Sequence, residues 1–216
     1  MAYPFERPSL FFAKEKATLA TLAETDDPFD PKFPTRLPSL EAYRFDTIKN
    51  IVCAYRRAKK EKRLLRSADA LIVTGDAEGQ SPNDASDALF WFIEFKNQNV
   101  ANIQSYDDSK ENALVVKAFD SLNLCAMTFG RDISMQDLQK RSVFIVVYPK
   151  QSYSDQILAA LGQLAGNNPD PWSRRPMWLL DNLLDAGFYR HILTVDDEEF
   201  ADTVFPVLQR GILPVV

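Results

Sequence analysis

Two runs of strongly apolar residues place the tightest constraint on how this chain can fold. Residues 88–96 (ALFWFIEFK) and 141–148 (RSVFIVVY) are rich in β-branched and aromatic side chains, as strands in the middle of a covered sheet are. Between them, residues 109–124 have the apolar spacing of a helix. The order strand, helix, strand predicts an α/β fold.

Shorter segments extend this pattern toward both ends of the chain. Further strands are expected over 69–74 and 191–195, and further helices over 9–24, 39–65, 154–165, 177–186 and 196–205. Gly187 lies where a glycine commonly ends a helix, and Asp196 with Glu199 has the spacing of a capping box. The expected architecture is a central mixed sheet flanked by helices.

The length and composition fit one domain. The chain has 216 residues and 46% of them are apolar, which is enough for a sizeable core. Within a single domain spanning 1–216, we expect an α/β core over 39–150. A helix and a proline-rich connector occupy 1–38, and helices with a strand form an extension over 151–216.

Histidine, cysteine and glycine are scarce, which excludes several kinds of site. His191, Cys53 and Cys125 cannot supply a zinc finger, an HExxH metalloprotease or a haem attachment motif, and no glycine-rich phosphate loop is present. No apolar run approaches the about 20 residues of a membrane span, and the first residues lack a basic start followed by an apolar stretch. We expect a cytoplasmic protein with reduced thiols and no membrane partner.

The charge is distributed unevenly along the chain. The formal net charge is -5, yet residues 32–66 carry a local balance of +8, which leaves -13 for the remainder. Seven cations fall within residues 56–66, namely Arg56, Arg57, Lys59, Lys60, Lys62, Arg63 and Arg66. One interpretation is a solvated helix whose cations suit the negative end of its dipole. The other is an edge that faces phosphates.

Charged residues at the end of the strand over 88–96 form a candidate site. Glu94 and Lys96 share one strand face, because the side-chain period of a strand is two. A hairpin centred on residues 81 and 82 would place Asp69 opposite Glu94, about 5 Å away. Two carboxylates with the backbone carbonyl of Phe95 are hard ligands that favour Mg²⁺ or Mn²⁺. The alternative is an ordinary salt bridge at a strand end, with Asp69 capping a turn.

An Asp, a loop, four apolar residues and Glu94-Phe95-Lys96 resemble the signature of the PD-(D/E)XK nuclease superfamily. The resemblance covers residues 39–150 and implies the restriction-endonuclease-like αβββαβ core. It also implies that Asp69 and Glu94 hold a metal ion while Lys96 positions the water that hydrolyses a phosphodiester. Two departures are Ala68, where the formal motif has Pro, and Asn97, where Gly is frequent.

The resemblance implies further site residues and a partner. Many members add an acid from the preceding helix, for which Glu41 is the first candidate and Glu61 the second. The nucleic-acid contacts expected from the basic segment and the following helix are Arg56, Arg57, Lys59, Lys60, Arg63, Lys110 and Lys117. The expected partner is nucleic acid, DNA rather than RNA, and a homodimer is one alternative for the oligomeric state.

Two other functions remain open at the level of the sequence. The same fold can serve as a binding or regulatory module that no longer cuts, which suits the acidic remainder of the chain. A plain α/β protein unrelated to nucleases is the third alternative. In that protein Asp69 and Glu94 would lie on different faces of the sheet.

Overall fold

The structure of the chain is a computed structural model. It describes residues 12–24, 37, 39–58, 65–75, 88–96, 108–129, 133–150, 170–177 and 179–213. The predicted helix over 154–165, most of the proline-rich connector, and Lys59, Lys60, Glu61 and Arg63 lie outside these residues. So do the side chains of Arg57 and Lys110, whose backbones belong to described helices.

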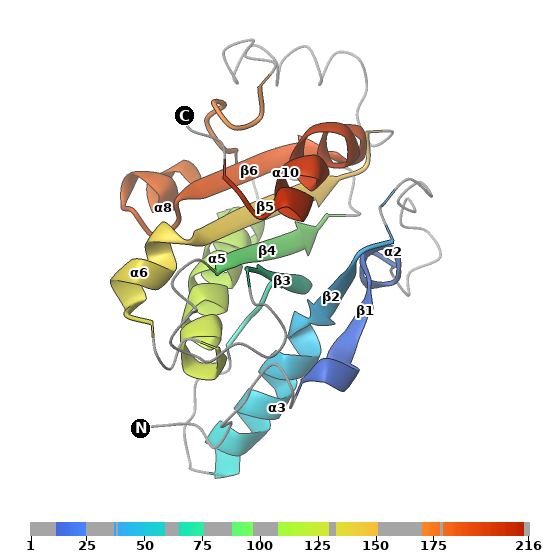
Figure 1. The fold of residues 1–216 in the computed structure, drawn as a ribbon. Coiled ribbons are helices and arrows are strands. Elements are labelled where there is room, and N and C mark those ends of the chain that lie inside the picture. The colour runs from blue at the N-terminus through green and yellow to red at the C-terminus, as the bar shows by residue number, and fades with distance from the viewer. Residues whose placement is uncertain are drawn as a thin grey trace.

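A six-stranded mixed sheet forms the centre of the molecule (Figure 1). Its strands are β1 (Lys16–Thr18), β2 (Glu41–Arg44), β3 (Ala70–Thr74), β4 (Leu89–Phe95), β5 (Ser142–Tyr148) and β6 (His191–Asp196). Their order in the sheet follows the sequence. The first four strands pair antiparallel, whereas β4, β5 and β6 are parallel. This is the central mixed sheet that the sequence predicts.

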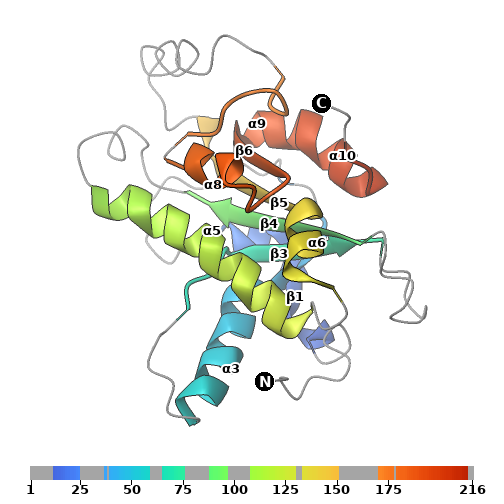
Figure 2. The ribbon, with the colours of Figure 1, turned by 90° about the vertical axis from the view of Figure 1, so that its left-hand side faces the viewer.

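Helices cover both faces of the sheet. In chain order they are η1 (Ala13–Glu15), α2 (Leu19–Leu22), α3 (Phe45–Ala58), α5 (Asp108–Thr128), α6 (Met135–Lys140), α8 (Asp181–Asp185), α9 (Asp197–Glu199), the π-helical η4 (Phe200–Val204) and α10 (Phe205–Arg210). Figure 2 shows α5 along one face and α10 across the other. None of the helices in the described ranges is both long and apolar enough to cross a membrane.

Side-chain alternation along β4 divides the core into two layers. Phe90 and Phe92 pack in the cluster formed with α3, α5, α6 and α8. Trp91 and Ile93 pack in the opposite cluster, which includes residues of α2, η4 and α10. Because alternate residues of a strand face opposite sides, Glu94 continues the row of Phe92 and points to the layer that contains α5.

The N-terminal predictions are wrong in two places. Residues 9–24 are not one helix, since β1 lies between the short helices η1 and α2. The long helix predicted over 39–65 begins only at Phe45, because residues 41–44 form β2. β1 and β2 pair antiparallel, Lys16 opposite Tyr43, and β2 continues onto β3. Hydrogen bonds between distant segments thus override local helical spacing.

The predictions for the later elements are largely confirmed. Strands β3 to β6 fall within one residue of the predicted bounds, and α5 continues four residues beyond its predicted end. Asp196 and Glu199 form the capping box, and Gly187 adopts a positive φ of 70° after α8. Helix α6 was not predicted. In the described residues, two strands, β3 and β4, lie between α3 and α5, whereas β1 and β2 precede α3, so three strands do not follow α3 as the αβββαβ order expects.

Candidate active site

The β3–β4 hairpin brings Asp69 opposite Glu94. Ala70 pairs with Ile93, so the next pair along the same register is Asp69 with Glu94. The Asp69 N–H donates to the Ile93 carbonyl at 3.0 Å, and the Phe95 N–H donates to Asp69 Oδ2 at 2.7 Å. The hairpin symmetry read from the sequence predicts this register, and both acids lie on the same side of the sheet.

Glu94 is a buried acid with two lysine partners. Its side chain is 1% exposed, and Lys96 Nζ lies 2.8 Å from Glu94 Oε1. The ammonium of Lys117 donates to both Glu94 oxygens, at 2.7 and 2.9 Å. A buried carboxylate is costly unless it is paired, and here two cations supply that pairing.

Lys117 also approaches the second acid. Its Nζ lies 3.7 Å from Asp69 Oδ1, so one ammonium from α5 contacts both carboxylates. The sequence assigned Lys117 to nucleic-acid contacts, whereas the structure places it within the acid pair. Lys110 belongs to the same helix, but its side chain is outside the described part of the chain.

The electrostatics of the pair leave Asp69 poorly stabilised as an anion. Burial has the largest effect and, together with the charge of Glu94, raises the pKa of Asp69 to about 7 against the opposing influence of Lys117. Burial alone would lower the pKa of Lys117, but the charges of Glu94 and Asp69 outweigh burial and raise it. Burial thus makes the ionised form of Asp69 unfavourable even though two ammonium groups lie beside the pair.

Three hydrogen bonds fix the chain that leads into Asp69. The Arg66 N–H donates to Asp120 Oδ2 at 3.0 Å, and the Ala68 N–H donates to Ser121 Oγ at 2.8 Å. Between them, the Ser67 hydroxyl donates to Asp46 on α3. Sequence reasoning missed these contacts. The available signal was the polar pair Asp120-Ser121 between the apolar residues Phe119 and Leu122 of the helix.

A helix-borne acid whose charge acts on the pair is Asp46, not Glu41. Asp46 lies in the first turn of α3, and its charge contributes to raising the pKa of both Asp69 and Lys117. Glu41 is exposed on β2, and the pairing of Tyr43 with Leu71 puts it beside residue 73. That position is about 13 Å along β3 from Asp69. The first-choice assignment of Glu41 is therefore wrong.

The remaining predicted residues lie at varying distances from the pair. The carbonyl proposed as a third ligand belongs to Phe95, the last residue of β4, between the two charged residues. Arg56 is half-buried near the end of α3, and its neighbours from Lys59 onward are outside the described residues. For these cations the phosphate-binding role stays a prediction.

The donor set fits a divalent cation in charge and in kind. Two opposed carboxylates offer hard oxygen ligands, and a cation between them would stabilise Asp69 as an anion. Asp46 adds a further acid nearby. Among the described residues, however, no three His, Cys, Asp or Glu side chains are grouped closely enough to hold a metal ion. The fit therefore depends on two carboxylates.

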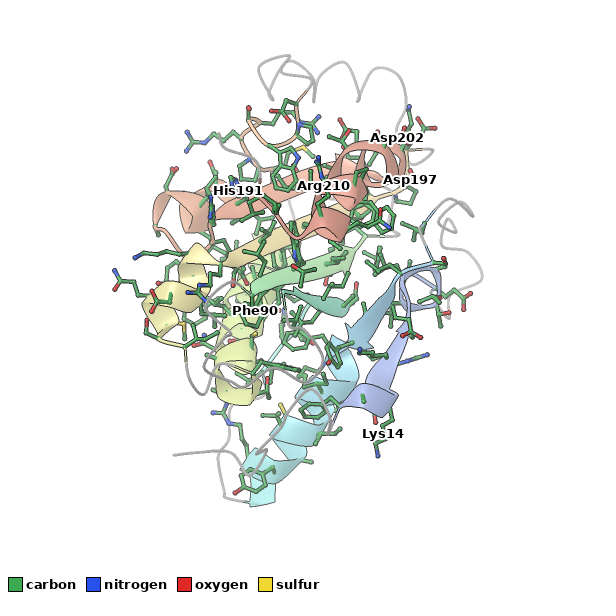
Figure 3. All side chains as sticks on the ribbon, in the orientation of Figure 1. Lys14, Phe90, His191, Asp197, Asp202 and Arg210 are labelled. Carbon is green, nitrogen blue, oxygen red and sulfur yellow. The ribbon has the colours of Figure 1, made fainter. Side chains whose placement is uncertain are left out.

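His191 lies away from this site. It opens β6 and pairs with Val143, whereas Asp197 follows the far end of that strand (Figure 3). The ring of Trp172 meets the imidazole edge-on at 5.5 Å, and His191 Nε2 has no hydrogen-bond partner among the described residues. Burial, followed by the charge of Arg190, lowers the pKa of His191. His191 therefore takes no part in the acid pair.

Comparisons with known proteins identify no relative of this chain. No family model, no curated protein and no solved structure matches the chain. The functional interpretation rests on the geometry of Asp69, Glu94, Lys96 and Lys117.

Proposed function

We propose that this chain is a metal-dependent nuclease of the PD-(D/E)XK type, which hydrolyses phosphodiester bonds at Asp69, Glu94 and Lys96. The observation that carries the proposal is the facing pair Asp69 and Glu94 at the end of a buried hairpin, with Lys96 bonded to Glu94. Two acids and an amine close together at a strand end support the proposal, because the resemblance implies that these three groups act together.

The energetics favour a functional role over a stabilising one. Glu94 is almost fully buried beside a second acid, and Asp69 has a pKa near neutrality because of burial and of Glu94. Two opposed and buried carboxylates are unfavourable for folding unless cations pair with them, and such groups tend to occur where a protein needs charge for binding or chemistry. The pair therefore supports a site for a cationic ligand.

In the proposed reaction, Asp69, Glu94 and the Phe95 carbonyl would hold Mg²⁺ or Mn²⁺, and Asp46 on α3 would add negative charge near the pair. The metal would supply a positive charge that polarises the phosphate and acidifies a water molecule. Lys96, whose side chain is 24% exposed, would donate a hydrogen bond to the water that attacks the phosphate. The restriction-endonuclease-like core is part of the proposal.

The proposed substrate is nucleic acid, DNA rather than RNA. The support is the basic segment of residues 56–66, which leads along the chain into Asp69. Cations along one edge would hold the phosphate backbone without reading its bases. A homodimer would let two such sites act on both strands of a duplex.

Cleavage of DNA in the presence of Mg²⁺ tests the proposal. We expect Glu94→Ala and Lys96→Ala to reduce cleavage by at least about a hundredfold, because each removes a group needed for the chemical step. Lys140→Ala, on the exposed end of α6, is the control and should cut as the unaltered protein does. Unchanged cleavage by both site variants would show that the assignment is wrong.

A second candidate is a restriction-endonuclease-like scaffold that binds partners without cutting. The observation in its favour is Lys117, whose ammonium already neutralises the acid pair. Titration calorimetry with Mn²⁺ separates the two functions. Binding that Asp69→Asn abolishes supports the nuclease, and no binding at millimolar metal supports the scaffold.

A further inference from the structure

Lys117 occupies the position that a cation would take in the acid pair. Its Nζ is 2.7 and 2.9 Å from the two Glu94 oxygens and 3.7 Å from Asp69 Oδ1. Lys96 directly follows the strand that contains Glu94, whereas Lys117 belongs to helix α5. The contact therefore results from packing between elements and not from neighbouring positions in the sequence.

An ammonium and a metal ion cannot both sit between these carboxylates. A divalent cation bound to Asp69 and Glu94 would lie within a few ångström of Lys117 Nζ, and like charges at that distance repel strongly. The acids also have a limited number of lone pairs, of which Lys117 now uses one on each Glu94 oxygen. Binding of one cation thus requires the other to leave.

We propose that Lys117 is the built-in counter-cation of the acid pair, which a divalent metal ion must displace, and that it thereby sets the metal affinity of the site. The inference rests on the proposed function in taking Asp69 and Glu94 as metal ligands. Lys117 is a positioning residue in this account, because it acts through the two carboxylates.

The side chain of Lys117 can make this exchange while α5 stays in place. It is 26% exposed, and four methylene groups allow the ammonium to turn toward water. The helix itself is held by the buried Ala118 and Leu122, and by Ser121, which accepts the Ala68 N–H. Displacement therefore costs a side-chain rotation and not a rearrangement of the core.

Calorimetric titration with Mn²⁺ alone tests the inference without any activity measurement. We expect Lys117→Gln to bind Mn²⁺ about tenfold more tightly than the unaltered protein, because a competing charge at close range is removed. Lys117→Met, which keeps an apolar stem, should behave alike, and either variant decides the test if the other misfolds. Lys117→Arg keeps the charge and should restore the weaker affinity.

Lys140→Gln is a matched control for the loss of one positive charge. Lys140 ends α6 just before β5, in which Ser142 pairs with Phe90. It therefore lies at the opposite end of β4, about 20 Å along the strand from Lys96. We expect its Mn²⁺ affinity to equal that of the unaltered protein.

The outcomes separate the inference from the proposed function. Tighter binding in the Lys117→Gln and Lys117→Met variants alone supports both. Equal or weaker binding in these variants, with metal still bound to the unaltered protein, overturns the inference and leaves the proposed function standing. Absence of Mn²⁺ binding in every protein overturns both, and a damaged fold would weaken binding rather than tighten it.

Discussion

The two acids of the candidate site differ in how their charges are supported. Glu94 is 1% exposed and bonded to two ammonium groups, whereas Asp69 is 23% exposed and accepts one backbone N–H. Ionisation is therefore less favourable for Asp69 than for Glu94. Burial and the charge of Glu94 raise the pKa of Asp69 to about 7. At the scale of residues, the charge of Asp69 therefore lowers the stability of the fold.

Asp69→Asn should stabilise the protein above neutral pH. Because folding raises this pKa from 3.8 to about 7, the stability that Asp69 contributes is fully present below about pH 4 and lost as the pH rises through 7. Asn still accepts the Phe95 N–H but carries no charge. We expect a gain of about 1–2 kcal/mol in the free energy of unfolding at pH 8, less than the full shift because the attraction of Lys117 is lost too.

Urea denaturation of both proteins between pH 4 and pH 8 measures this difference. The gain should disappear near pH 4, where Asp69 is protonated in the folded protein as well. A variant less stable than the unaltered protein at pH 8 would show that Asp69 stabilises the fold as an anion.

The sequence predicted the acid pair but not its surroundings. The facing of Asp69 and Glu94 follows from hairpin symmetry, which depends on positions along one short stretch. Lys117 and Asp120 meet this hairpin from α5, and Asp46 meets it from α3. No periodicity in the sequence records such contacts between elements, so sequence reasoning could name Lys117 but not place it.

At the scale of elements, predictions succeed where a segment has a strong sequence pattern of its own. β4 and β5 are buried along their whole length, and their continuous apolar runs identify them without ambiguity. β1 and β2 have three and four residues, and they are strands only because they pair with each other and with β3. Such short strands have a weak sequence signal.

The capping box that begins α9 gives a prediction at this scale. Asp196 Oδ1 accepts the Glu199 N–H at 2.7 Å, one of the N–H groups that no helical carbonyl can satisfy. Asp196→Ala should lower the free energy of unfolding by about 1 kcal/mol. Asp202→Ala, at an exposed position of η4, should change it little. Equal losses in thermal denaturation would contradict a capping role, and Mn²⁺ affinity should change in neither variant.

At the scale of the whole molecule, a basic segment lies within a chain whose net charge is negative. Residues 32–66 carry +8 against a net charge of -5, and the segment ends just before Asp69. The described cations Lys96 and Lys117 lie at the acid pair, where both contact Glu94. The net charge of the chain therefore does not describe its local charge.

Removing charge from the basic segment should weaken binding to DNA. We expect the variant Lys59→Gln, Lys60→Gln, Arg63→Gln to bind duplex DNA more weakly, with the slope of log K against log salt reduced by up to about 3. Its Mn²⁺ affinity should be unchanged, because the acid pair is intact. Fluorescence anisotropy across a salt series measures the slope. An unchanged slope would assign these cations to solvent, as the other interpretation of the segment holds.

A crystal structure of the protein soaked in Mn²⁺ tests the central claim most directly, because the anomalous signal of the ion locates it without reference to activity. We predict one ion between the carboxylates of Asp69 and Glu94, close to the Phe95 carbonyl, with Lys117 turned away. No ion at this position in millimolar Mn²⁺, with Lys117 still bonded to Glu94, would contradict the claim that the acid pair is a metal site.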